Sequence, residues 1–168
     1  MPAPPDPDLR GVTAAFVGAS APFVVIGGFA VVANDYVRAT EDVDLLIGED
    51  DDAAVDRALI ELDAHWQDGR PYEPGGIAGR EHTRLVTSAG LVDLLREGEP
   101  PLDLASVSRD ALRADLGDGE FLVAGLASIV AFKRLAGRPR DRGDLEELAR
   151  LHGELPLLPL PGVDEDAR

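Results

Sequence analysis

Three aspartates stand inside apolar, strand-like segments of this 168-residue chain. Asp42 and Asp44 belong to "EDVDLLI", and Asp93 belongs to "GLVDLL". Residues i and i+2 of a β-strand point to one face with Cα atoms about 6.5–7 Å apart, so the first two carboxylates converge. If the strand that carries Asp93 is their neighbour, about 4.8 Å away, three carboxylates form one cluster.

Such a cluster needs a compensating positive charge, because carboxylates in a low dielectric repel one another. Hard oxygen ligands select Mg²⁺ or Mn²⁺. Two such ions about 3.5–4 Å apart support in-line phosphoryl displacement. The simpler interpretation is that Asp42 begins its strand at an exposed edge and that Asp93 is a solvated alternate position, since D-x-D alone is common.

The segment upstream favours the chemical interpretation. "VVIGGFA" is typical of a strand, a glycine pair and a helix start, and Gly27 and Gly28 let the backbone approach an anion that the first N–H groups of a helix face. A tight strand-to-helix turn would explain the pair if it stood alone. Here Gly28 precedes Asp42 by 14 positions, and Arg38 and Thr40 come just before the carboxylates.

Hydrophobic periodicity and Gly/Pro signals predict the elements that must position these residues. Helices are expected over 9–20, 29–36, 50–66, 126–137 and 141–153. Strands are expected over 22–28, 43–48 and 119–125, with a hairpin over 82–95 that turns at 88–90. Residues 104–114 fit either state. The mixture predicts an α+β or α/β fold with a C-terminal helical pair.

The amino-acid composition constrains the binding partners, the metal ligands and the cellular location of the protein. The net charge of −16 repels nucleic acid unless a basic patch or a metal ion intervenes. The absence of cysteine excludes disulfides and thiolate metal sites. The longest apolar run has 13 residues, too few to span a bilayer, so we expect a soluble, cytoplasmic protein. We predict one domain over 9–153, with flexible tails at 1–8 and 154–168.

Together these segments resemble the nucleotidyltransferase superfamily that includes DNA polymerase β. The family pattern is an apolar strand, Gly-Gly or Gly-Ser, D-x-[DE] and a later strand acid, and "VIGGFAVVANDYVRATEDVDLLI" is similar to its form in small bacterial members. "LASIVAFKRLAGRPRDRGDLEEL" is similar to the helix pair of AbiEii-type toxin enzymes. The matching pieces cover residues 23–48, 85–97 and 126–151. The implied fold is α+β, a mixed sheet flanked by helices.

The resemblance implies a role for each matching residue. Gly27 and Gly28 would lie against nucleotide phosphates, with Thr40 alongside. Asp42 and Asp44 would ligate Mg²⁺ or Mn²⁺, and Asp93 would ligate a second ion or accept a proton. Lys133 and Arg38 would neutralise charge on the triphosphate. Arg138, Asp141 and Asp144 would support them, although a structural ion-pair network explains these three at least as well.

The function implied is transfer of a nucleoside monophosphate from an NTP such as ATP to a hydroxyl of RNA, protein or a small molecule. As in some antibiotic-modifying relatives, Phe29 stands where many members carry Ser or Thr, which puts triphosphate affinity in question. Acidity favours a cationic acceptor such as an aminoglycoside, whereas the AbiEii-like helices favour RNA. The alternative is a catalytically silent binding partner in a toxin–antitoxin pair. A D-x-D glycosyltransferase ranks last, because it would not require the glycine pair.

Overall fold

The computed structural model describes residues 3–164. Over this part of the chain, strands and helices are interspersed. The helices are α1 (Leu9–Gly18), α2 (Gly27–Ala33), α3 (Asp52–Glu61), α4 (Leu104–Arg109), α5 (Leu126–Ala136) and α6 (Pro139–His152). The strands are β1 (Phe23–Ile26), β2 (Asp42–Ile47), β3 (His82–Thr87), β4 (Gly90–Arg96), β5 (Leu112–Asp115) and β6 (Glu120–Val123).

The described strands form one mixed sheet in the order β3-β4-β2-β1-β6-β5. β2 lies antiparallel to β1 and parallel to β4. β1 lies parallel to β6, and the two edges are the antiparallel hairpins β3–β4 and β5–β6. The predicted α+β class, a mixed sheet flanked by helices, is confirmed.

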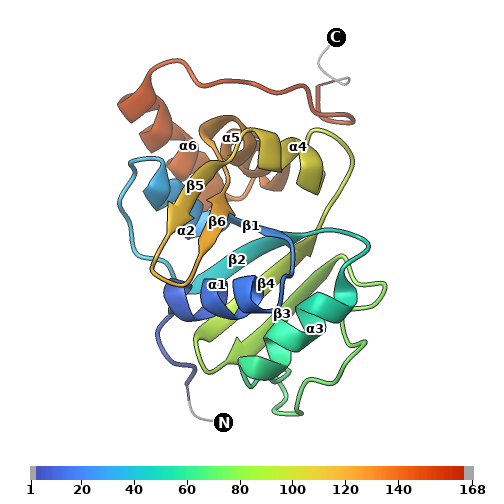
Figure 1. Cartoon of the computed structure of the whole chain (residues 1–168). Helices are drawn as coiled ribbons and strands as arrows, with labels where there is room; N and C mark the ends of the chain where they lie inside the picture. Colours follow the sequence, from blue (N-terminus) through green and yellow to red (C-terminus); the bar gives the residue numbers. More distant parts are fainter. Residues whose placement is uncertain (1–2, 165–168) are drawn as a thin grey trace.

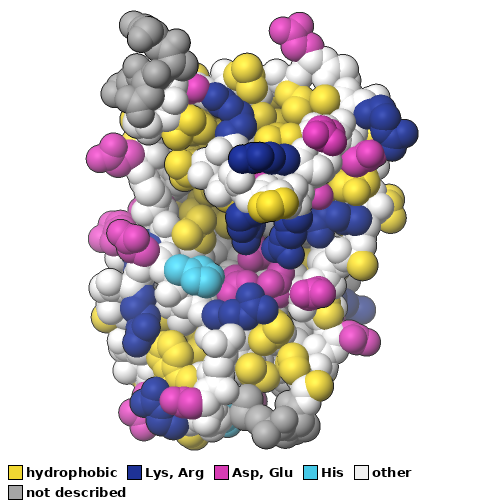
Figure 2. Space-filling view, turned by 180° about the vertical axis from the view of Figure 1, so that it is seen from behind, with side chains coloured by type: hydrophobic (Ala, Val, Ile, Leu, Met, Phe, Trp, Pro, Cys, Tyr) yellow, Lys and Arg dark blue, Asp and Glu magenta, His cyan; other side chains and the backbone are white. Residues whose placement is uncertain are grey.

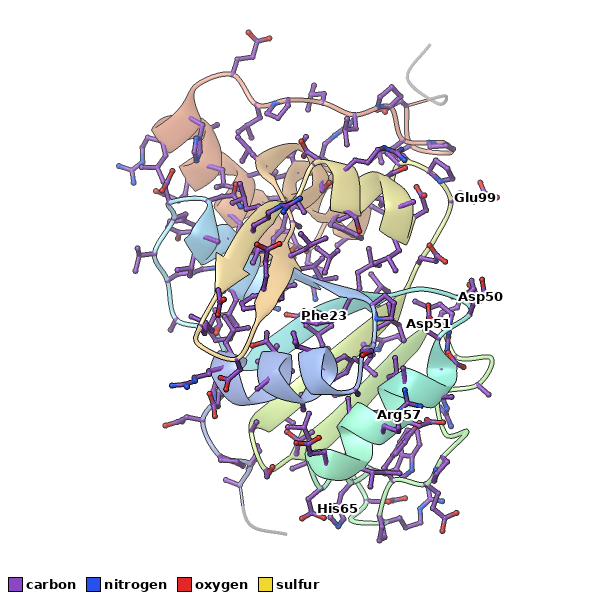
Figure 3. All side chains as sticks on the ribbon, in the orientation of Figure 1. Phe23, Asp50, Asp51, Arg57, His65 and Glu99 are labelled. Atoms are coloured by element: carbon purple, nitrogen blue, oxygen red, sulfur yellow. The ribbon has the colours of Figure 1, made fainter. Side chains whose placement is uncertain are left out.

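The apolar core is formed by residues of the sheet and of the helices that pack against it. Figure 1 shows α1 and α3 side by side in front of the lower part of the sheet, with α4, α5 and α6 above it. Phe23 begins β1 (Figure 3), and its ring meets that of Phe16 in α1 edge-on at 5.4 Å and stacks on Phe121 at 6.2 Å. Aromatic pairs of this kind stabilise a core beyond the area they bury.

The helix predicted over 50–66 is shorter in the structure. Asp50 and Asp51 lie outside its first turn (Figure 3), and the helix begins at Asp52, whose carboxylate pairs with Arg96 at 2.7 Å. It ends before Asp63, which has a φ of 49°. From there the backbone turns back to the sheet, and His65 forms a bridge to β3. Ion pairing and a left-handed turn therefore set these limits.

Two other segments add detail to the expectations, one that periodicity left open and one that was expected to be a flexible tail. Residues 104–114 divide into α4 and β5, with the Asp103 side chain accepting a hydrogen bond from the Ser106 N–H at the start of α4. In the predicted C-terminal tail, Leu160 is 3% exposed and packs with Leu102 and Ala131. Residues 165–168 of that tail lie outside the described residues, as do residues 1–2 of the N-terminal one.

None of the helices within residues 3–164 combines the length and the apolar character that a bilayer crossing requires.

Candidate functional site

The three aspartates predicted to cluster do so in the structure. β2 and β4 are parallel neighbours, and their register sets Asp44 directly opposite Asp93. Asp42 lies two residues before Asp44 and therefore shares its face of the sheet. Each residue offers one carboxylate oxygen to a group whose atoms all lie within 4.8 Å of one another. We call Asp42, Asp44 and Asp93 the carboxylate triad.

The glycine pair brings the start of α2 against this triad. Gly27 has a φ of +67°, and a Cβ atom there would lie 2.1 Å from Oδ2 of Asp44. At Gly28 a Cβ atom would lie 2.5 Å from Cγ2 of Thr40. No side chain fits at either position, so the pair is required for backbone to approach both the carboxylate and the loop before β2.

An ion-pair network on α5 and α6 faces the triad across a cavity. Nζ of Lys133 lies 3.1 Å from Asp141 and 2.8 Å from Asp144. Nε of Arg138 lies 2.7 Å from Asp141, and Nε of Arg38 lies 3.0 Å from Asp144. The contacts of Lys133 with both carboxylates fit both options that the sequence left open, support of the site and a structural ion-pair network. Arg38 links the loop before β2 to α6.

The cavity between the sheet and these helices has a volume of about 490 Å³. Its polar side includes the triad, both glycines, Arg38, Lys133, Arg138 and Arg140. Its apolar side is made by Leu95, Ile129, Phe132, Leu135 and Ala136. Figure 2 shows basic side chains gathered around acidic ones in a hollow in the middle of this face. The cavity thus joins charged groups to an apolar wall.

Known structures share this architecture at low sequence identity. ANT(2″)-Ia, solved in complex with adenylyl-2″-tobramycin, matches with 12% identity and a TM-score of 0.56, covering 86% of this chain and 87% of that chain. The lincosamide antibiotic adenylyltransferase LnuA, lincomycin-bound, matches with 12% identity and a TM-score of 0.56, covering 86% and 98%. A nucleotidyltransferase-like protein from Paracoccidioides brasiliensis matches with 18% identity and a TM-score of 0.52, covering 86% and 76%.

This chain has the nucleotidyltransferase fold. The sequence itself matches no protein-family model and no curated protein. At these identities the structural likeness establishes the fold, and any chemistry must be argued from the residues that the fold brings together.

The nucleotidyltransferase fold places the triad in a strained electrostatic setting. Burial, followed by the charges of Asp42 and Asp93, raises the pKa of Asp44 to about 8. Burial and the nearby Asp42 also raise the pKa of Asp93, and Arg84 opposes that shift. Oδ1 of Asp93 is buried without a hydrogen bond. Clustered oxygens with an unsatisfied acceptor are the ligand set that Mg²⁺ or Mn²⁺ prefers, so these residues fit such an ion.

The sequence reasoning did not assign to the site three charged or titratable residues of the cavity, namely Arg140 of α6 and, on β3, Arg84 and His82. Nη1 of Arg84 lies 2.8 Å from Oδ2 of Asp93 and 3.3 Å from Oδ2 of Asp42. Nε2 of His82 lies 3.2 Å from Oδ1 of Asp93. For Arg84 and His82 the available signal was their spacing: positions i and i+2 of the strand that forms a hairpin with the strand of Asp93.

The α5–α6 network of this nucleotidyltransferase fold is closely balanced in charge. Lys133 is 6% exposed, and Asp141 and Asp144 are both buried. Although burial opposes the shift, hydrogen bonds from Arg138 and Lys133 lower the pKa of Asp141 to about 2. A buried lysine flanked by two carboxylates is stable only because each charge has a partner. The network holds α5 against α6 and sets the cavity wall.

Proposed function

We propose that this protein is a metal-dependent nucleotidyltransferase that transfers an NMP from an NTP to a hydroxyl group and releases pyrophosphate. The observation that carries the proposal is the carboxylate triad, assembled from two adjacent strands beside a glycine pair and open to one cavity. Buried carboxylates that repel one another are costly unless a cation joins them. The nucleotidyltransferase fold makes transfer to a hydroxyl the reaction that this arrangement suits.

Each group at the cavity has a distinct task in that reaction. Asp42 and Asp44 hold the ion, and Asp93 on the adjacent strand completes the ligand set or accepts the proton of the attacking hydroxyl. When bound, Mg²⁺ or Mn²⁺ stabilises negative charge on the transferring phosphoryl group. The walls of the cavity align the attacking oxygen with the phosphorus and limit the access of water.

The phosphates are expected to bind at the glycine pair. Without side chains, Gly27 and Gly28 expose the backbone at the start of α2, and Phe29 offers no hydroxyl to replace a backbone contact. Arg38 and Lys133 supply positive charge at the same cavity. Lys133 already contacts two carboxylates of α6, which hold its ammonium group in place. Its role is therefore to attract the triphosphate as a fixed positive charge.

The acceptor is proposed as a class, a hydroxyl of RNA, protein or a small molecule. ANT(2″)-Ia was solved with adenylyl-2″-tobramycin, and LnuA is a lincosamide adenylyltransferase solved with lincomycin. These neighbours favour a small-molecule acceptor for this chain too. The resemblance to AbiEii-type enzymes favours RNA and an antitoxin partner.

One observation favours the alternative of a catalytically silent nucleotidyltransferase-like binding partner in a toxin–antitoxin pair. The charges of Asp93 and Lys133 are already compensated by protein groups, as they would be in a scaffold that holds no substrate. A silent scaffold would keep the fold and the cavity and would lack transfer activity.

The test is incubation with each labelled NTP, Mg²⁺ or Mn²⁺, and a panel of total tRNA, cell lysate and aminoglycosides. The wild-type protein is expected to label at least one acceptor, and Asp44→Ala is expected to label none. Glu120→Ala serves as the control, because it removes an exposed carboxylate from the β5–β6 hairpin. Transfer that survives Asp44→Ala would reject the site, and the absence of transfer to any acceptor would support the silent partner.

A further inference from the structure

The guanidinium of Arg84 lies within the carboxylate triad. A single nitrogen, Nη1, contacts one oxygen of Asp93 at 2.8 Å and one oxygen of Asp42 at 3.3 Å. Arginine is always charged in proteins, so this is a permanent positive charge between two of the three carboxylates.

The sheet fixes the position of Arg84. In the antiparallel β3–β4 pair, Arg84 is the direct partner of Asp93. Side chains of directly opposed residues lie on one face with Cβ atoms about 4.5–5.5 Å apart. The side chain of Arg84 is 35% exposed, and that of Asp93 is 9% exposed. The contact is therefore a cross-strand pair at the floor of the cavity and does not depend on a flexible loop.

The position of this nitrogen limits how many metal ions the triad can hold. A divalent ion that bridged Oδ2 of Asp42 and Oδ2 of Asp93 would have to lie between the two oxygens that Nη1 already contacts. The other oxygens of the triad lie outside the contacts of Nη1, including Oδ1 of Asp93, which accepts no hydrogen bond and lies 3.2 Å from Nε2 of His82. With all three carboxylates ionised, as metal ligands must be, the triad and Arg84 together carry two net negative charges, which one divalent ion neutralises.

We propose that Arg84 takes the place of one of the two divalent ions that a carboxylate triad of this kind can hold, so that this protein binds a single ion there. The proposal rests on the proposed function only in assigning a metal to the triad. Arg84 is then a positioning residue: it keeps Asp42 and Asp93 together and sets the number of ions at one.

The experiment is a titration with MnCl₂ of the whole, metal-free protein in the absence of nucleotide. Free Mn²⁺ is measured by electron paramagnetic resonance, which gives the number of bound ions without any transfer activity. We expect one bound ion in the wild-type protein, one in Arg84→Lys and two in Arg84→Gln, the second binding more weakly. Asp44→Asn should lose the ion or bind it at least tenfold more weakly.

The matched control is Arg113→Gln, which removes the same charge at an exposed arginine of the β5–β6 hairpin and should bind one ion. Two bound ions in the wild-type protein would overturn the role of Arg84 and leave the metal-dependent function standing. A single ion in Arg84→Gln would likewise overturn it. No bound Mn²⁺ in any variant would reject the metal site itself and with it the proposed function. Should Arg84→Gln fail to fold, the same count on Arg84→Ala decides, with two bound ions supporting the role of Arg84 and a single ion overturning it.

Discussion

Among single residues, Asp44 carries the largest electrostatic penalty of the site. It stands opposite Asp93, two positions after Asp42, with a Gly27 backbone pressed against it on the other side. Its raised pKa, about 8, means that the folded protein without metal prefers this carboxyl protonated. The residue is retained at a cost in stability, which is typical of side chains that serve a site rather than the fold.

The first prediction follows from the sign of that shift. The folded pKa of Asp44 lies above its ordinary value of 3.8, so stability from this group is complete below about pH 4 and is lost as the pH rises to about 8. In metal-free buffer, Asp44→Asn should therefore match the wild type near pH 4 and exceed it by a few kcal/mol near pH 8. Urea unfolding with a chelator present measures the difference.

Added Mg²⁺ supplies the control for this prediction. A ligand that binds only the folded state stabilises it by about 2.7 kcal/mol at 100 times its Kd. Mg²⁺ should therefore raise the unfolding free energy of the wild type and raise that of Asp44→Asn by about half as much or less. A variant less stable than the wild type at both pH values would contradict the repulsion assigned to Asp44.

The residue scale also separates what the sequence predicts from what it does not. Asp42, Asp44 and Asp93 are recognisable from the sequence because burying a carboxylate within an apolar segment costs free energy. A residue kept despite that cost is a candidate for a functional role. Arg84 and His82 lie on an edge strand in which alternate positions are normally solvated, so they carry no such signal. Only the pairing of β3 with β4 reveals that they face the triad.

At the level of elements, the α5–α6 pair depends on one buried lysine. Replacing Lys133 by Ala leaves Asp141 and Asp144 buried without that partner, and removing one member of a buried ion pair costs about 3–5 kcal/mol. We expect Lys133→Ala to lose stability in this range, measured by thermal or urea unfolding. The exposed Arg142 on α6 is the control, and Arg142→Ala should stay within about 0.5 kcal/mol of the wild type.

An unfolding free energy of Lys133→Ala equal to that of Arg142→Ala would show that the network does not hold the helices together. Lys133 would then have to be explained by substrate binding alone.

The glycine pair provides the third prediction. Gly27→Ala places a Cβ atom 2.1 Å from Oδ2 of Asp44 in a left-handed backbone conformation, so the start of α2 must move away from the triad. We expect loss of Mn²⁺ binding together with reduced stability. Gly143, inside α6, has no atom within 4 Å of its added Cβ, and Gly143→Ala should gain about 0.5–1 kcal/mol. Calorimetric titration with Mn²⁺ and thermal unfolding report the two effects.

Equal Mn²⁺ binding by Gly27→Ala and Gly143→Ala would show that the close approach of Gly27 to Asp44 is not required for metal binding.

Individual strands and helices were easier to predict from the sequence than the pairing between strands. The strand that carries Asp42 and the hairpin that carries Asp93 follow from alternation and a turn at 88–90, and both are present. The adjacency of β2 and β4 was a condition that the sequence left open, because parallel pairing joins residues some fifty positions apart and no local pattern encodes it. Helix α3 ends early for a similar reason, since the chain turns at Asp63 and then pairs through His65 with the distant Val86 of β3.

On the scale of the whole molecule, charge is distributed unevenly. The chain carries −16 overall, yet five basic side chains line the cavity, namely Arg38, Arg84, Lys133, Arg138 and Arg140. The overall composition led us to favour a cationic acceptor, but it could not show that the arginines gather at one face (Figure 2). A local basic lining suits phosphate groups and allows an acidic protein to bind an anionic nucleotide.

The fourth prediction concerns the C-terminal segment. Leu160 is buried against Leu102 and Ala131, whereas Leu157, three residues earlier, is 67% exposed. Leu160→Ala should cost about 2 kcal/mol or more, and Leu157→Ala should be close to neutral. Chemical unfolding of the two variants measures the difference. Equal stabilities would mean that this segment contributes nothing to the domain, as the predicted tail boundary at 154 implies.

The direct opposition of Asp44 and Asp93 links folding to function. Val43 and Val92 occupy the reverse face of the same two strands and are fully buried there. Sliding β4 by a single residue would send its acid into the hydrocarbon interior and turn valine toward the cavity, because side chains alternate between faces. A chain with this register error would lose both the carboxylate cluster and the apolar packing. No stably folded form with an incorrectly assembled site is therefore expected.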